Sequence, residues 1–142
     1  MENKIKVGIS CGDPNGVGME VVLKALSDNR ILDSIIPVLY AHPEWVKQTK
    51  KALKLEEVMY FNINSAKEAQ PKKINLVSVL KDAPLNIEWG KADGKAGEWA
   101  FKSLESAAQD LANNSIDVLV TAPINKETIQ KLKIFVLASI II

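Results

Sequence analysis

Short apolar runs, many of them rich in β-branched residues, recur along the chain at the length of β-strands. The run Ile5–Ser10 alternates apolar and polar positions, which is the period of a strand. A second run, at 35–40, contains Pro37, which favours the edge of a sheet or the start of a strand. By the same pattern, further strands are predicted at 58–61, 74–80 and 116–120.

Several of the segments between these runs carry apolar residues three and four positions apart, the spacing of amphipathic helices. We expect helices from Met19 to about Asp28, from Glu44 to Leu53, and from Lys95 to Asn113. The segments 62–73 and 82–94 are polar or contain Pro and Gly, so they are predicted to be irregular. Strands that alternate with helices predict an α/β fold, a three-layer sandwich around a mainly parallel sheet.

The composition is that of one soluble domain. The 142 residues carry 18 Lys+Arg and 17 Asp+Glu, a formal net charge of +1, which argues against a nucleic-acid partner. The single cysteine, Cys11, excludes an internal disulfide. Its lone thiol and a polar, charged N-terminus favour a cytoplasmic protein. The apolar segment 131–142 is shorter than the roughly 20 residues of a membrane-spanning helix, so no membrane partner is expected.

The loop after the first strand is a candidate ligand site. Gly12, Gly16 and Gly18 lie between a predicted strand and a predicted helix, where free backbone N–H groups can bind an anion. Their spacing is neither that of a dinucleotide fingerprint nor that of a P-loop. The alternative is a tight turn in which Asp13 accepts hydrogen bonds from backbone amides.

The loop after the last predicted strand is the second candidate. Thr121, Asn125 and Lys126 place a hydroxyl, an amide and a cation close together in sequence. The lysine ammonium suits a substrate phosphate or carboxylate, although a solvated lysine in a first helical turn is the alternative. His42, the only histidine, precedes a proline and is expected to serve packing or lie at the surface.

Three ordered segments resemble the 4-hydroxythreonine-4-phosphate dehydrogenases. Residues 12–20, G-D-P-N-G-V-G-M-E, are similar to that family's G-D-P-x-G-(I/V)-G-x-E opening after a first strand. Residues 90–100 are similar to its G-K-x(5)-G-x-x-A segment. Residues 116–126 resemble its strand that ends in T-(A/G)-P-(I/V)-x-K. The resemblance covers about residues 4–130.

The resemblance implies an isocitrate/isopropylmalate dehydrogenase-like fold and a homodimer whose active site is near the subunit interface. It implies NAD-dependent oxidation of 4-phosphooxy-L-threonine, followed by decarboxylation, on the route to pyridoxal phosphate. A divalent metal held by histidines would polarise the hydroxyl of this phosphorylated substrate. By position, the substrate-binding residues would be Asp13, Thr121, Asn125 and Lys126, in loops shaped by the glycines named above.

The chain departs from the family pattern at about Lys131. The family's G-H-T-E segment and its three metal-binding histidines would follow, and the sequence has neither. No metal ligand can therefore be assigned, and His42 matches none. We interpret residues 1–130 as the N-terminal part of such a dehydrogenase and residues 131–142 as an apolar tail produced by truncation or a frameshift.

On this interpretation we expect the chain alone to be inactive. Two alternatives stay open: a non-catalytic phosphate-binding fragment, and a sister dehydrogenase for another phosphorylated hydroxy acid. Sequencing the source DNA beyond the codon for Ile142 tests the frameshift. We expect another frame to encode G-H-T-E and later histidines, and the absence of any such frame would make the short chain the true product.

Overall fold

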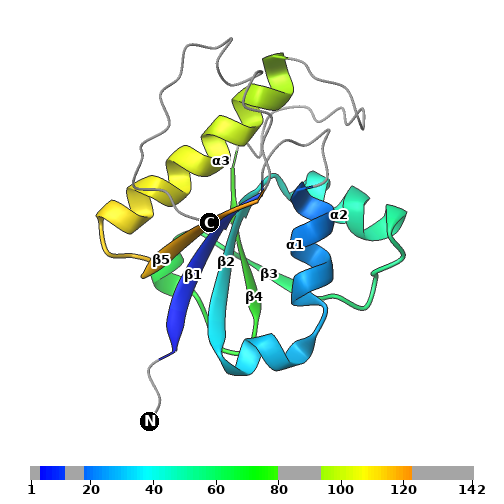
Figure 1. Ribbon diagram of the computed structural model, residues 1–142, viewed down its shortest axis with the longest axis horizontal. Helices are drawn as coiled ribbons and strands as arrows, with labels where there is room; N and C mark the ends of the chain where they lie inside the picture. Colours follow the sequence, from blue (N-terminus) through cyan, green and yellow to red (C-terminus); the bar gives the residue numbers. More distant parts are fainter. Residues whose placement is uncertain (1–3, 12–17, 80–93, 123–142) are drawn as a thin grey trace.

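Five parallel strands form the central layer of the protein (Figure 1). The computed structural model describes residues 4–11, 18–79 and 94–122. Within these ranges the strands lie in the order β3-β4-β2-β1-β5, and each printed pairing is parallel. Their bounds are β1 Ile5–Ser10, β2 Ile35–Ala41, β3 Tyr60–Ile63, β4 Ile74–Ser78 and β5 Val118–Thr121.

Helices cover both faces of this sheet. Helices α1 (Gly18–Leu26) and α2 (Pro43–Ala52) lie on one face, and α3 (Gly94–Ala112) lies on the other (Figure 1). Two short 3-10 helices, η1 (Asn29–Asp33) and η2 (Ala66–Glu68), precede β2 and β4. The predicted three-layer α/β sandwich with a parallel sheet is therefore confirmed. Among the described residues, no helix has the length and apolar character needed to cross a membrane.

The strand side chains pack into two cores, one on each face of the sheet. In β2, Leu39 and Ala41 join the core beneath α1 and α2, whereas Val38 and Tyr40 join the core beneath α3. All four side chains are at most 1% exposed. A parallel strand that is buried on both faces is apolar at consecutive positions. This explains the continuous apolar run in this part of the sequence.

The predicted elements match the observed ones closely except at the bounds of three strands. Strand β3 ends two residues later than predicted, and β4 ends at Ser78 although its prediction ran to residue 80. Strands β3 and β5 each begin two residues later than predicted, because the buried residues Val58 and Ile116 precede them in loops. The short helices η1 and η2 were not predicted, and η2 lies in the segment expected to be irregular. Helix α3 ends beside Asn114, whose φ of 61° is the left-handed conformation that asparagine tolerates at helix ends. Most of the predicted loop 82–94 lies outside the described residues.

Pro37 was predicted at the edge of a sheet or near the start of a strand. It is the third residue of β2, near its start, but the edge position is wrong because β2 is the central strand of the five. The register pairs Val38 with Asn75 of β4. Continued by one step, it would join the N–H of residue 37 to the carbonyl of Lys73. Proline has no N–H, and the side-chain amide of Asn75 donates to that carbonyl instead (3.1 Å).

Asn75 is fully buried and satisfies the backbone at this point of the sheet. Its amide nitrogen also lies 3.1 Å from the carbonyl oxygens of Pro37 and Gln70. Its side-chain oxygen accepts a hydrogen bond from the Gln70 N–H (3.0 Å). One side chain therefore replaces the bond that Pro37 cannot make and fixes the chain before β4.

We predict that Asn75→Ala destabilises the protein by about 2–4 kcal/mol, because it leaves several buried backbone groups without partners. Urea unfolding measures this change. The exposed Asn62 of β3 provides the matched control, and Asn62→Ala should stay within about 0.5 kcal/mol of the unmodified chain. Equal effects of the two substitutions would contradict the role assigned to Asn75.

Candidate functional site

The two candidate loops begin side by side at the carboxyl edge of the sheet. Strands β1 and β5 are neighbours, and their last residues, Ser10 and Thr121, are register partners. One residue further, the N–H of Ala122 donates to the carbonyl of Ser10 (2.9 Å). At the opposite ends of the two strands, the N–H of Lys6 donates to a carboxylate oxygen of Asp117 (2.8 Å), and the Asp117 N–H donates to the Lys6 carbonyl (2.9 Å). These bonds fix the register that places the two loop starts together.

The direction of strand succession reverses at β1. The chain places β2, β3 and β4 on one side of β1, in the spatial order β2, β4, β3 outward, and β5 then pairs with the other side of β1 (Figure 1). Helix α1 follows β1 on one face, and α3 precedes β5 on the opposite face. In open parallel sheets, ligands bind beyond the carboxyl ends of the strands at such a reversal. We call the region beyond Ser10 and Thr121 the crevice.

Only part of the predicted site falls within the described residues. Thr121 ends β5 at the crevice and is half-buried, while Gly18 is buried as the first residue of α1. The roles predicted for these two residues stay predictions. The other predicted site residues, Gly12, Asp13, Gly16, Asn125 and Lys126, lie outside the described residues.

Ser103 ties α3 to the carboxyl ends of β1 and β2. This buried hydroxyl accepts a hydrogen bond from the N–H of Cys11 (3.2 Å) and donates one to the carbonyl of Tyr40. Further along α3, Asp110 accepts a hydrogen bond from the Tyr40 hydroxyl (2.6 Å). The sequence motifs do not identify Ser103. The available signal is its polar side chain on the apolar stripe of the helix, one turn after Ala100.

Burial raises the pKa values of Cys11 and Tyr40, near this edge of the sheet. The thiol of Cys11 is fully buried, and desolvation raises its pKa to about 12. Burial also raises the pKa of Tyr40 well above its usual value, and the neighbouring Asp110 carboxylate raises it further. Neither side chain is therefore poised as an anionic nucleophile.

His42 has a structural role. It precedes α2 as its N-cap, and its Nδ1 accepts a hydrogen bond from the N–H of Glu44 (3.0 Å). Its ring stacks on Trp99 of α3, with centroids 4.9 Å apart and planes at 26°. The packing interpretation of His42 is therefore confirmed, in a buried position rather than at the surface. Across the described ranges, no three His, Cys, Asp or Glu side chains come together in a way that could hold a metal.

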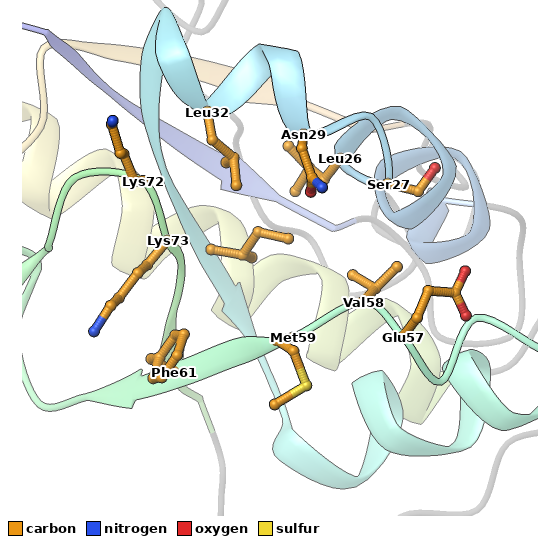
Figure 2. A pocket seen from close by; sticks show the side chains of 11 residues that line it. Leu26, Ser27, Asn29, Leu32, Glu57, Val58, Met59, Phe61, Lys72 and Lys73 are labelled. Carbon is orange, nitrogen blue, oxygen red and sulfur yellow. The ribbon is translucent and has the colours of Figure 1, made fainter.

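A pocket of about 380 Å³ lies at the other end of the sheet (Figure 2). Its walls come from the end of α1, from η1, and from residues at or just before the starts of β3 and β4. Lys73 and Phe61 flank it, with the ammonium 4.3 Å from the ring centroid. Because it opens at the amino ends of the strands, this pocket is separate from the crevice.

Comparison with known proteins places this arrangement in a family. The family model described as the pyridoxal phosphate biosynthetic protein PdxA matches residues 33–137, more than half of the chain. A 4-hydroxythreonine-4-phosphate dehydrogenase of Bacteroides thetaiotaomicron is 41% identical over 129 residues, covering 91% of this chain and 35% of that protein. A Clostridium botulinum protein named as a D-threonate 4-phosphate dehydrogenase is 30% identical over 136 residues, covering 92% of this chain and 40% of that protein.

Solved structures agree with the sequence comparison. The crystal structure of a 4-hydroxythreonine-4-phosphate dehydrogenase from Burkholderia phymatum matches with a TM-score of 0.81 at 26% identity. The match covers 91% of this chain and 39% of that one. The expected dehydrogenase-like fold is therefore confirmed, and the chain spans only 35–40% of the length of these relatives.

The raised pKa of Cys11 predicts a loss of stability at alkaline pH. Below about pH 9 the thiol is protonated in both states, but between about pH 9 and about pH 12 only the unfolded chain ionises it. Stability should therefore fall as pH rises, by at most about 1.4 kcal/mol per pH unit from this group. Urea unfolding at about pH 9 and about pH 10 should show a smaller fall in Cys11→Ala than in the unmodified chain. Tyr40 ionises in an overlapping range but is present in both proteins, so an identical fall in both would refute the prediction.

Proposed function

Because this chain belongs to the family of the pyridoxal phosphate biosynthetic protein PdxA, we propose that it forms part of an NAD-dependent dehydrogenase acting on 4-phosphooxy-L-threonine. The enzyme oxidises the secondary hydroxyl of this substrate to a ketone. The resulting β-keto acid then loses carbon dioxide. The product belongs to the route to pyridoxal phosphate.

The observation that carries this proposal is the pairing of Ser10 with Thr121. These residues begin the two loops in which the family resemblance is strongest, and the pairing makes the loops neighbours at a reversal of strand order. The 41% identity to the Bacteroides thetaiotaomicron enzyme supports the choice of substrate. The active site of the whole enzyme draws on residues beyond the part of its relatives that this chain spans.

In this proposal the second loop contacts the substrate. The ammonium of Lys126 binds its phosphate or carboxylate, while Thr121 and Asn125 add a hydroxyl and an amide for orientation. Asp13 lines the crevice from the first loop, whose shape depends on Gly12, Gly16 and Gly18. NAD would supply the hydride acceptor for this oxidation.

The divalent metal implied by the family does not fit the described residues. They contain no cluster of three potential ligands, and the single histidine of the sequence caps α2 and stacks on Trp99. We therefore assign no step of the reaction to a metal held by this chain. We further propose that the whole enzyme is a cytoplasmic homodimer, as the family resemblance implies.

A second candidate is the oxidation of D-threonate 4-phosphate. The 30% identity to the Clostridium botulinum protein favours it, although the identity to the first relative is higher. Both substrates carry a phosphate and a secondary hydroxyl, and they differ in whether carbon 2 bears an amine or a hydroxyl. A direct comparison of the two substrates decides between the candidates.

A chimera tests the proposed function. Residues 1–130 of this chain replace the matching segment of the Bacteroides thetaiotaomicron enzyme, and NADH formation is followed with each substrate. We expect turnover of 4-phosphooxy-L-threonine. Lys126→Ala in the chimera should lower kcat/KM about 10- to 100-fold, the effect of losing one hydrogen bond to a charged group.

Lys67→Ala serves as the control in the chimera, because Lys67 is exposed on η2 and distant in sequence from both loops. It should leave kcat/KM unchanged. A folded chimera that turns over neither substrate would refute the proposal that the two loops of this chain support the reaction. If the original chain nevertheless binds the phosphorylated substrate, the phosphate-binding fragment becomes the better description.

A further inference from the structure

Two buried hydroxyls at the crevice have no hydrogen-bond partner among the residues that the structure describes. They belong to Ser10, which is fully buried, and to Thr121. These residues are register partners at the ends of β1 and β5. A buried hydroxyl without a partner loses its bonds to water and gains none in return, so native proteins rarely leave one unsatisfied. Because the two hydroxyls lie on adjacent strands, at the edge where ligands bind, one bound group would satisfy both of them.

Both hydroxyls face the layer that contains α3. Ser10 alternates with Val7 and Ile9, which pack in the core beneath α1 and α2. Thr121 shares its side of β5 with Leu119, which packs in the core beneath α3. Neighbouring strands lie about 4.8 Å apart, and hydrogen bonds between oxygens span about 2.8 Å. One oxygen atom placed between the two side chains can therefore bond to both.

The surroundings indicate which group would fit. Cys11 and Ala122 follow the two hydroxyls in sequence, and neither carries a charge, since burial keeps the Cys11 thiol protonated. The N–H of Ala122 is already bonded to the Ser10 carbonyl, and the N–H of Cys11 to Ser103. Two neighbouring hydroxyls suit a neutral oxygen that both donates and accepts hydrogen bonds.

We propose that Ser10 and Thr121 form a two-hydroxyl site that binds one neutral oxygen, supplied by a buried water molecule or by a hydroxyl group of a ligand in the crevice. Ser10 thereby becomes a binding residue beside Thr121, at a position that no sequence motif identifies. The ligand source rests on the proposed function, whereas the water source is independent of it.

Thr49 provides a matched control, because its buried hydroxyl also has no hydrogen-bond partner within the described ranges. Thr49 is buried on α2, where rotation of its side chain can bring the hydroxyl to the carbonyl of Trp45, four residues earlier. Because Thr49 lies on a helix, it has no register partner at the end of a strand. Thr49→Val should not affect ligand binding.

The experiment uses the full chain with Ser10→Ala, Thr121→Val and the double substitution. Urea midpoints measure stability without ligand, and titration calorimetry measures the dissociation constant for 4-phosphooxy-L-threonine. If water fills the site, each single substitution lowers the midpoint, and the double substitution lowers it by less than the sum. If a ligand hydroxyl fills it, the midpoints hold and each single substitution raises the dissociation constant about 10-fold, the effect of losing one hydrogen bond.

Unchanged or raised midpoints together with unchanged dissociation constants would overturn the proposal. Should the unmodified chain not bind 4-phosphooxy-L-threonine, the ligand source fails with the proposed function, and the midpoints still decide the water source. Magnetisation transfer from water to the amide of Ala122, measured by NMR on the unmodified chain, is a second readout that needs no variant. A long-lived water near this amide supports a buried water molecule as the occupant of the site. If no such water is detected and the midpoints are unchanged, a buried water molecule is ruled out as the occupant.

Discussion

The structure depends on the attachment of α3 to the sheet through Tyr40 and Ser103. Tyr40 lies on the central strand, where its hydroxyl bonds to Asp110 and its carbonyl accepts from Ser103. The same Ser103 hydroxyl accepts from Cys11 at the end of β1. Three secondary-structure elements are thus joined through a few buried polar atoms, in a core where an unpaired polar atom would be costly. The helix covers the face of the sheet on which the side chains of Ser10 and Thr121 lie, next to the crevice.

Much of this architecture follows from the spacing of apolar residues. Continuous runs such as that around Val38 are typical of parallel strands buried on both faces, and they predicted the strands to within about two residues. Where the observed positions differ from the prediction, contacts between distant segments are responsible. Pro37 fits a central strand because Asn75, 38 positions later, supplies the missing donor. Val58 extended an apolar run although it serves the core from a loop. Neither effect is visible in a local window of sequence.

The two candidate loops of the crevice could be predicted from the sequence, but the pairing of the strands that place them together could not. Loops that follow parallel strands meet at one edge, so the sequence could indicate two candidate loops. It could not indicate that β1 and β5 are neighbours, because strand order depends on how α3 carries the chain back across the sheet. The sequence did not identify Ser10 as a site residue for the same reason. A serine at a strand end indicates a site only once Thr121 is known to lie beside it. The pairing of distant segments, and not residue type, makes these positions candidates for function.

An all-parallel sheet also governs the order in which such a protein can assemble. No two described strands are joined by a hairpin, so every pairing requires the chain to close a long loop first. The longest closure is the one between β1 and β5, which joins Val7 to Val118. During synthesis, almost the whole described chain must therefore emerge from the ribosome before β1 can pair with its second neighbour, β5. High contact order of this kind slows folding, and here the described strand that is synthesised last, β5, is the one that completes the edge of the sheet at the crevice.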